Sequence, residues 1–148
     1  MRAVPAAGLA TDSAGARRRL WSLVVVLIAL VGVSCTALPG ASAERVWVVL
    51  VLAPLAEEAV FRAGLQEVLL RHWHAPLVAN LATAATFGLA HAVSHGDAAA
   101  FAAAGPALLI GVAYTRWRQL RLCVVLHAAM NAAWLAWRLA GAAPYPGP

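Results

Sequence analysis

The sequence predicts an all-α protein, a polytopic membrane bundle of about five transmembrane helices, because it is apolar, sparsely charged and divided by short polar breaks. Its 148 residues are 63% hydrophobic and only 11% charged, whereas a soluble domain carries about 25% charged residues. The mean hydropathy is +0.77. A transmembrane helix needs about 20 apolar residues, so this length suits one membrane domain with short connections.

The N-terminal part contains the first expected helix. We expect residues 1–16, which are small and polar, to be disordered. An arginine triplet then precedes an apolar run over Leu20–Leu38. The following Pro39–Ala43 stretch resembles a signal-peptidase site, so the run is either a retained anchor or a cleaved signal peptide. About 19 apolar residues exceed the 7–15 of a signal-peptide core, which favours the anchor.

Four further apolar stretches predict helices, and polar, proline or glycine clusters separate them. Gly105–Pro106 leaves open whether one of them is kinked or split. Residues 17–143 would form the single domain, followed by a proline-rich tail at 144–148. The expected helix ranges are 46–70, 76–93, 98–114 and 120–140.

All basic residues of this chain are arginines, and most of them lie at the ends of the expected spans. A net charge of +5 could indicate nucleic acid, but this distribution is typical of topology signals in a membrane protein. Composition rich in alanine and arginine and free of lysine indicates a GC-rich bacterial source, and hence a bacterial inner (plasma) membrane. The unequal distribution of arginines between the two sides predicts that the N-terminus is cytoplasmic. One side would carry Arg17, Arg18, Arg19, Arg71, Arg116, Arg118 and Arg121, and the other Arg45 and Arg138.

The expected helix at 46–70 carries three charged residues near its middle, Glu57, Glu58 and Arg62. Each isolated charge there costs about 2.5–3.5 kcal/mol on the insertion scale, so pairing and a protein-facing orientation must relieve the cost. Glu58 and Arg62 are one turn apart on one face, which predicts an ion pair. Glu57 points about 100° away and is free to face another helix. Pro54, one turn earlier, could kink the helix and expose backbone carbonyls.

Two other expected helices carry polar pairs with the same four-residue spacing. Phe87 and His91 lie in the helix at 76–93, and His127 and Asn131 in the helix at 120–140. A lone histidine or amide inside a span could be a satisfied core residue or a polar contact between helices. Beside a buried carboxylate, the same groups could orient water or stabilise an oxyanion. We expect His95, which follows His91 by one turn, in the loop after the helix.

With Glu-Glu-x-x-x-Arg at Glu57–Arg62, Phe-x-x-x-His at Phe87–His91 and His-x-x-x-Asn at His127–Asn131, the sequence resembles the CAAX protease and bacteriocin-processing (CPBP, or Abi) family of intramembrane endopeptidases. Each motif is weak alone, but the three occur in order on separate spans. The resemblance covers about half of the chain. The chain is short for this family, so elements that recognise substrate in larger members would be missing.

The resemblance implies a hydrolase that cuts a peptide bond of a membrane-associated protein or peptide, with the bilayer and not nucleic acid as its other partner. Glu57 and His91 would activate water, while His127 and Asn131 would stabilise the oxyanion. Zinc could be held by Glu57, His91 and His127 with one open position. The same groups could equally perform acid/base catalysis without a metal. We favour the metal-free mechanism and assign no cofactor from the sequence. The supporting residues would be Glu58, Arg62 and Phe87.

Two other classes of protein remain open. A non-catalytic membrane protein, such as an immunity or partner-binding factor with the same fold, would use the polar residues to hold helices together. A proton-coupled carrier is a further alternative, because chains of Glu and His also relay protons across membranes. The sequence shows no inverted repeat, which many carriers have, so the protease remains our leading hypothesis.

Overall fold

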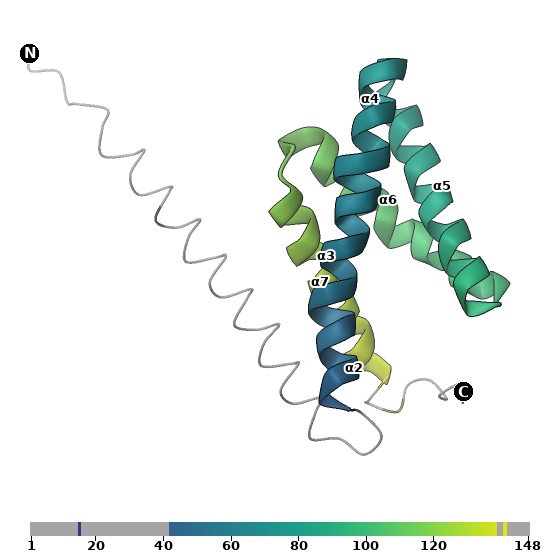
Figure 1. The fold of residues 1–148 in the computed structure, drawn as a ribbon, viewed down its shortest axis with the longest axis vertical. Coiled ribbons are helices and arrows are strands. Elements are labelled where there is room, and N and C mark those ends of the chain that lie inside the picture. Colours follow the sequence, from purple (N-terminus) through teal and green to yellow (C-terminus); the bar gives the residue numbers. More distant parts are fainter. Residues whose placement is uncertain (1–14, 16–41, 139–140, 142–148) are drawn as a thin grey trace, which may run out of the picture.

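The computed structural model describes residue 15, residues 42–138 and residue 141. Within this part, every regular element is a helix (Figure 1). The predicted all-α class is therefore confirmed for the described residues. The expected disordered N-terminus, the Leu20–Leu38 run and the tail lie outside them, so the expected number of about five spans is not established.

The expected helix at 46–70 is longer at both ends than predicted and runs without interruption from Ala43 to Trp73. The Ser42 side chain accepts a hydrogen bond from the backbone N–H of Arg45 at 3.2 Å, and such a cap favours a helix start. At the other end His74 adopts a left-handed conformation, which stops the helix. The consecutive segments are α2 (Ala43–Trp47), η1 (Val48–Leu52), α3 (Ala53–Glu58), η2 (Ala59–Gln66) and α4 (Glu67–Trp73).

Two of these segments, η1 and η2, are π-helical, a form that often occurs at functional sites. The first explains how the helix continues through Pro54. The N–H of Ala53 donates to the carbonyl of Val48, five residues back. In that register the Val49 carbonyl faces Pro54, which has no N–H to donate. The Val49 carbonyl is therefore left for a partner outside its own helix.

The remaining helices are α5 (Pro76–His95), η3 (Ala98–Ala103), α6 (Ala104–Trp117) and α7 (Leu120–Trp137). Our expectation that His95 lies in a loop was wrong. His95 belongs to the last turn of α5, because the chain turns only at Gly96, whose φ of 63° is a conformation that glycine adopts without strain. The stretch expected at 98–114 begins as the 3₁₀ helix η3 and becomes α-helical at Ala104, directly before Gly105–Pro106.

The long helix runs along the length of the described bundle (Figure 1) and contacts α5, α6 and α7. Helix α5 packs against η2, α4 and α6, and α7 packs against η1, α3 and α6. Small residues fill many of the contacts, which lets the helix backbones approach closely, as in other membrane bundles. Buried examples are Ala79, Ala84, Ala107, Ala113, Ala128 and Ala132.

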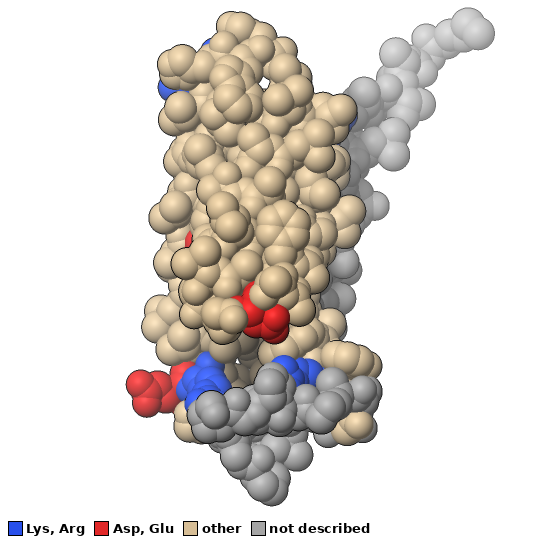
Figure 2. All heavy atoms as spheres, turned by 90° about the vertical axis from the view of Figure 1, so that its right-hand side faces the viewer, with Lys and Arg blue, Asp and Glu red and all other residues tan. Residues whose placement is uncertain are grey.

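Three of the described helices are long and apolar enough to cross a membrane: α5, the stretch Ala98–Trp117, and α7. Figure 2 shows a face whose broad middle carries almost no charged side chain. The described arginines outside this band separate as predicted. Arg71 and the arginines around the α6–α7 connection belong to one end of the bundle, while Arg45 and Arg138 belong to the other (Figure 1).

Candidate active site

A fully buried arginine forms the centre of the polar cluster. The Arg62 side chain donates to Glu58 Oε2 at 2.9 Å, to Gln66 Oε1 at 2.8 Å and to the Ala107 carbonyl at 2.8 Å. Glu58, Arg62 and Gln66 each have 0% exposure. The ion pair predicted from the sequence is therefore present, and the hydrogen bond from Arg62 to the Ala107 carbonyl joins the long helix to α6. Leaving either charge without its partner at such a site costs about 3–5 kcal/mol.

Gln66 is a buried member of this cluster to which the sequence analysis gave no role. Its amide nitrogen donates to the Gly111 carbonyl at 2.9 Å and to Thr115 Oγ1 at 3.0 Å. Glu58, Arg62 and Gln66 are spaced by four residues and therefore lie on the same face of the helix. This spacing could have identified Gln66 as a member of the cluster. No sequence pattern pointed to Thr115 and Gly111 as partners of Gln66, because they lie on a different helix.

His127 lies between the two carboxylates of the long helix. Its Nδ1 is 2.8 Å from Glu58 Oε1, and its Nε2 is 3.6 Å from Glu57 Oε2. The Glu58 carboxylate is ionised against Arg62 and can only accept, so Nδ1 carries the hydrogen and Nε2 presents its lone pair toward Glu57. A carboxylate that holds one imidazole nitrogen fixes both the tautomer and the orientation of the ring.

Glu57 differs from Glu58 in its surroundings, as their separation around the helix predicts. The Glu57 side chain is 28% exposed, against 0% for Glu58. Its Oε2 atom is nevertheless buried and has no hydrogen-bond partner among the described residues. Glu57 is thus a carboxylate with unused acceptor capacity next to an imidazole lone pair, which is a suitable place for a water molecule or a transferred proton.

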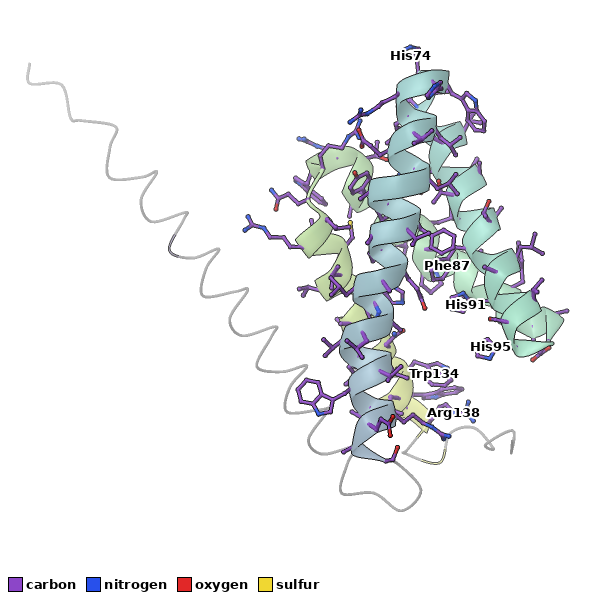
Figure 3. All side chains as sticks on the ribbon, viewed as in Figure 1. His74, Phe87, His91, His95, Trp134 and Arg138 are labelled. Carbon is purple, nitrogen blue, oxygen red and sulfur yellow. The ribbon has the colours of Figure 1, made fainter. Side chains whose placement is uncertain are left out.

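His91 lies beside Phe87, one turn further along α5 (Figure 3). The two rings of α5 are stacked with centroids 4.3 Å apart, and Phe87 also meets the rings of His127 at 5.8 Å and Phe61 at 4.9 Å. His91 Nδ1 lies 3.2 Å from the Phe87 carbonyl. In the described part of the chain no hydrogen bond or ion pair joins His91 to Glu57, so the two groups expected to activate water together are not in direct contact.

Asn131 lies one turn beyond His127 on α7 and contacts the long helix at its proline. Its amide nitrogen donates to the Val49 carbonyl at 2.9 Å, the acceptor that Pro54 leaves without an intrahelical donor. Pro54 thus exposes a carbonyl near the site, although the helix does not break there. One amide N–H of Asn131 is used in this bond, and the second remains for another acceptor.

The described residues do not fit the three-ligand zinc site considered above. No group of three or more His, Cys, Asp or Glu side chains in residues 42–138 is arranged to hold a metal ion. Glu57 and His127 approach each other, but His91 is stacked on Phe87 and does not complete a ligand set with them. We therefore derive no catalytic step through a metal.

Ionisable side chains buried inside apolar helices are rare in membrane proteins and mark functional sites. A family model described as "Type II CAAX prenyl endopeptidase Rce1-like" matches residues 39–133. The chain belongs to this family, and it is an integral membrane protein. The match includes all three motifs, so the family resemblance inferred from them is confirmed. No curated protein and no solved structure matches the chain.

Proposed function

We propose that this protein is an intramembrane endopeptidase that hydrolyses a peptide bond of a membrane-associated protein or peptide. The observation that carries the proposal is the position of His127 between a buried, arginine-paired Glu58 and the partly exposed Glu57. Membership of a family of prenyl endopeptidases supports the same reaction. A positioned group that takes a proton from water accelerates hydrolysis, and the Glu57–His127 pair can supply such a group.

In this proposal Glu57 is the general base. It removes a proton from a water molecule whose oxygen attacks the carbonyl carbon of the scissile peptide. Because Glu57 Oε2 and His127 Nε2 are 3.6 Å apart, the proton can be shared with His127, and the imidazolium that results is stabilised by Glu58. The proton finally passes to the leaving amine as the C–N bond breaks, so atoms and charges balance.

His127 also fits the expected oxyanion role, but only in its protonated form. With Nδ1–H directed at Glu58, the neutral ring has no hydrogen on Nε2 to donate. Once Nε2 has received the proton, it can donate to the developing oxyanion, and the second N–H of Asn131 can add to it. His91 would act from across the Phe87 ring, as a second imidazole that orients water or substrate.

We propose further that the protein lies in a bacterial inner membrane with its arginine-rich end in the cytoplasm. Basic residues near the ends of spans are retained on that side, and the described arginines divide between the two ends of the bundle accordingly. Reporter fusions to the α6–α7 connection and to the α5–η3 connection should report opposite sides. Reporters on the same side would contradict the helix arrangement, and the reverse assignment would contradict the orientation.

The test of the proposed reaction is cleavage of membrane peptides by the purified chain. Peptides with a prenylated carboxyl-terminal cysteine motif, the same peptides without the lipid, and unrelated membrane peptides would be compared by mass spectrometry. We expect Glu57→Gln to lower the cleavage rate by about 10²–10⁴-fold, the usual contribution of a general base. Glu44→Gln, the same change at an exposed position of the same long helix, should leave the rate unchanged.

The same experiment separates the alternatives. Equal cleavage by wild type and Glu57→Gln would remove Glu57 from the mechanism. If no peptide is cut, but Glu57→Gln and His91→Gln cells keep the phenotype of the wild type, the protein is a non-catalytic factor. A chelator added to the active enzyme should not change the rate under the metal-free mechanism, and a loss that zinc restores would contradict it.

A further inference from the structure

A groove outside the candidate active site lies between the beginning of α5 and the end of α6. Its volume is about 500 Å³, and it is lined by Pro76, Leu77, Asn80, Val112, Thr115 and Arg116. These residues belong to the end of the bundle where the α4–α5 and α6–α7 connections meet (Figure 1). The groove therefore extends from the apolar band toward the arginine-rich end of the protein.

The walls of the groove are apolar and face outward. Leu77 is 70% exposed and Val112 is 59% exposed, although both belong to helices that are apolar enough to cross the membrane. In a bilayer these side chains contact hydrocarbon and not water. Asn80 and Thr115 add polar groups on the inner side, so a molecule in this groove would meet an apolar wall and a polar edge.

The cation at the rim of the groove has no partner among the described residues. Two neighbouring arginines at this end, Arg71 and Arg118, are both engaged with Glu67. Arg116, in contrast, has no hydrogen bond or ion pair to any described residue and is exposed. The adjacent start of α5 at Pro76 has no side-chain cap, so its first free N–H groups and helix dipole also favour a negative charge nearby. The rim thus offers uncompensated positive charge at headgroup depth.

We propose that the α5–α6 groove binds one anionic phospholipid, with an acyl chain between Leu77 and Val112 and the phosphate at Arg116. Charge and depth both favour this occupant. A juxtamembrane arginine attracts anionic headgroups by about 1 kcal/mol, and the apolar walls exclude a purely polar anion from the rest of the groove. The proposal does not depend on catalysis, because no hydrogen bond or ion pair joins the described groove residues to Glu57, His91 or His127.

The test uses the purified full-length chain in a neutral detergent, with phosphatidylglycerol and phosphatidylcholine as probes. Native mass spectrometry would count bound lipid during a titration, and thermal melting would report the stabilisation that binding produces. We expect phosphatidylglycerol to be retained and to raise the melting temperature more than phosphatidylcholine. Equal retention of the two lipids would overturn the proposal.

Two arginine variants locate the site. Arg116→Gln should weaken phosphatidylglycerol binding about fivefold, which is the affinity equivalent of one arginine at the headgroup. Arg121→Gln removes the same charge at the same end but outside the groove, and it should have less than a twofold effect. Equal losses in both variants would show that only the general surface charge matters and would overturn the proposal. Inorganic phosphate should not stabilise the protein, and equal stabilisation by phosphate would indicate a free-anion site instead.

Discussion

The contact between Gly111 on α6 and Asn80 on α5 allows a quantitative test of how the buried arginine is held. A Cβ atom added at Gly111 would lie 1.7 Å from Asn80 Oδ1, 2.7 Å from Asn80 Cγ and 3.0 Å from Arg62 Nη1. The Asn80 amide donates to the Leu108 carbonyl at 3.1 Å and is 4% exposed. Gly111→Ala must therefore displace Asn80 and crowd Arg62.

The expected cost of Gly111→Ala is about 2 kcal/mol of stability. Overpacking a buried site costs about 1–3 kcal/mol, and loss of the Asn80 hydrogen bond adds about 1 kcal/mol. The better helix propensity of alanine returns up to about 1 kcal/mol. For a chain of this size a loss of about 2 kcal/mol lowers the melting temperature by roughly 8 °C.

Thermal melting of the purified variant in detergent measures this cost, and peptide cleavage measures its effect on the site. Gly105→Ala is the matched control, because it lies on the same helix and its added Cβ would meet nothing within 4 Å. We expect Gly105→Ala to show no loss of stability and Gly111→Ala to lose both stability and activity. A Gly111→Ala protein that melts with the wild type would refute the close packing of α5, α6 and Arg62.

Two further substitutions test single contacts of the site. Arg62→Met leaves Glu58 buried without its partner and should cost about 3–5 kcal/mol of stability. Arg71→Met breaks an ion pair to Glu67 of the same 2.9 Å length, but the Arg71 side chain is 73% exposed, so this change should cost under about 1 kcal/mol. Similar melting temperatures for the two variants would contradict burial of the Glu58–Arg62 pair. Asn131→Leu removes the donor to the Val49 carbonyl and should cost about 1–3 kcal/mol of stability. Asn131→Gln keeps an amide but moves it away from the carbonyl, so full stability in Asn131→Gln would contradict the geometry of this hydrogen bond.

Much of the architecture was predictable from local patterns. Apolar runs separated by glycine, proline and polar clusters gave the described helices to within a few residues, because each span must be long enough to cross the bilayer and must end where the chain can turn. The Glu58–Arg62 pair was equally predictable, since a four-residue spacing fixes two side chains on one helix face. Gln66 extends the same face and could have been included on that basis.

The arrangement of the candidate active site depends on contacts between helices, which spacing along the chain does not determine. His127 reaches Glu58 across 69 positions of the sequence, and Asn131 reaches Val49 across 82. The sequence correctly placed these groups on separate helices but could not give the rotation of α7 relative to the long helix. The family resemblance implied that Glu57 acts with His91, whereas the structure brings Glu57 close to His127.

The sequence by itself determined that the chain is a helical membrane protein of a known peptidase family, because hydrophobicity, helix periodicity and the three motifs can be read directly along the chain. Only the tertiary structure decided which partner each polar group has. Burial in an apolar bundle makes an unpaired polar group costly, and the helices pack so that Arg62, Glu58 and His127 satisfy one another. Glu57 Oε2 and Asn80 Oδ1 remain buried acceptors without a hydrogen bond among the described residues, and the proposed chemistry would take place at Glu57.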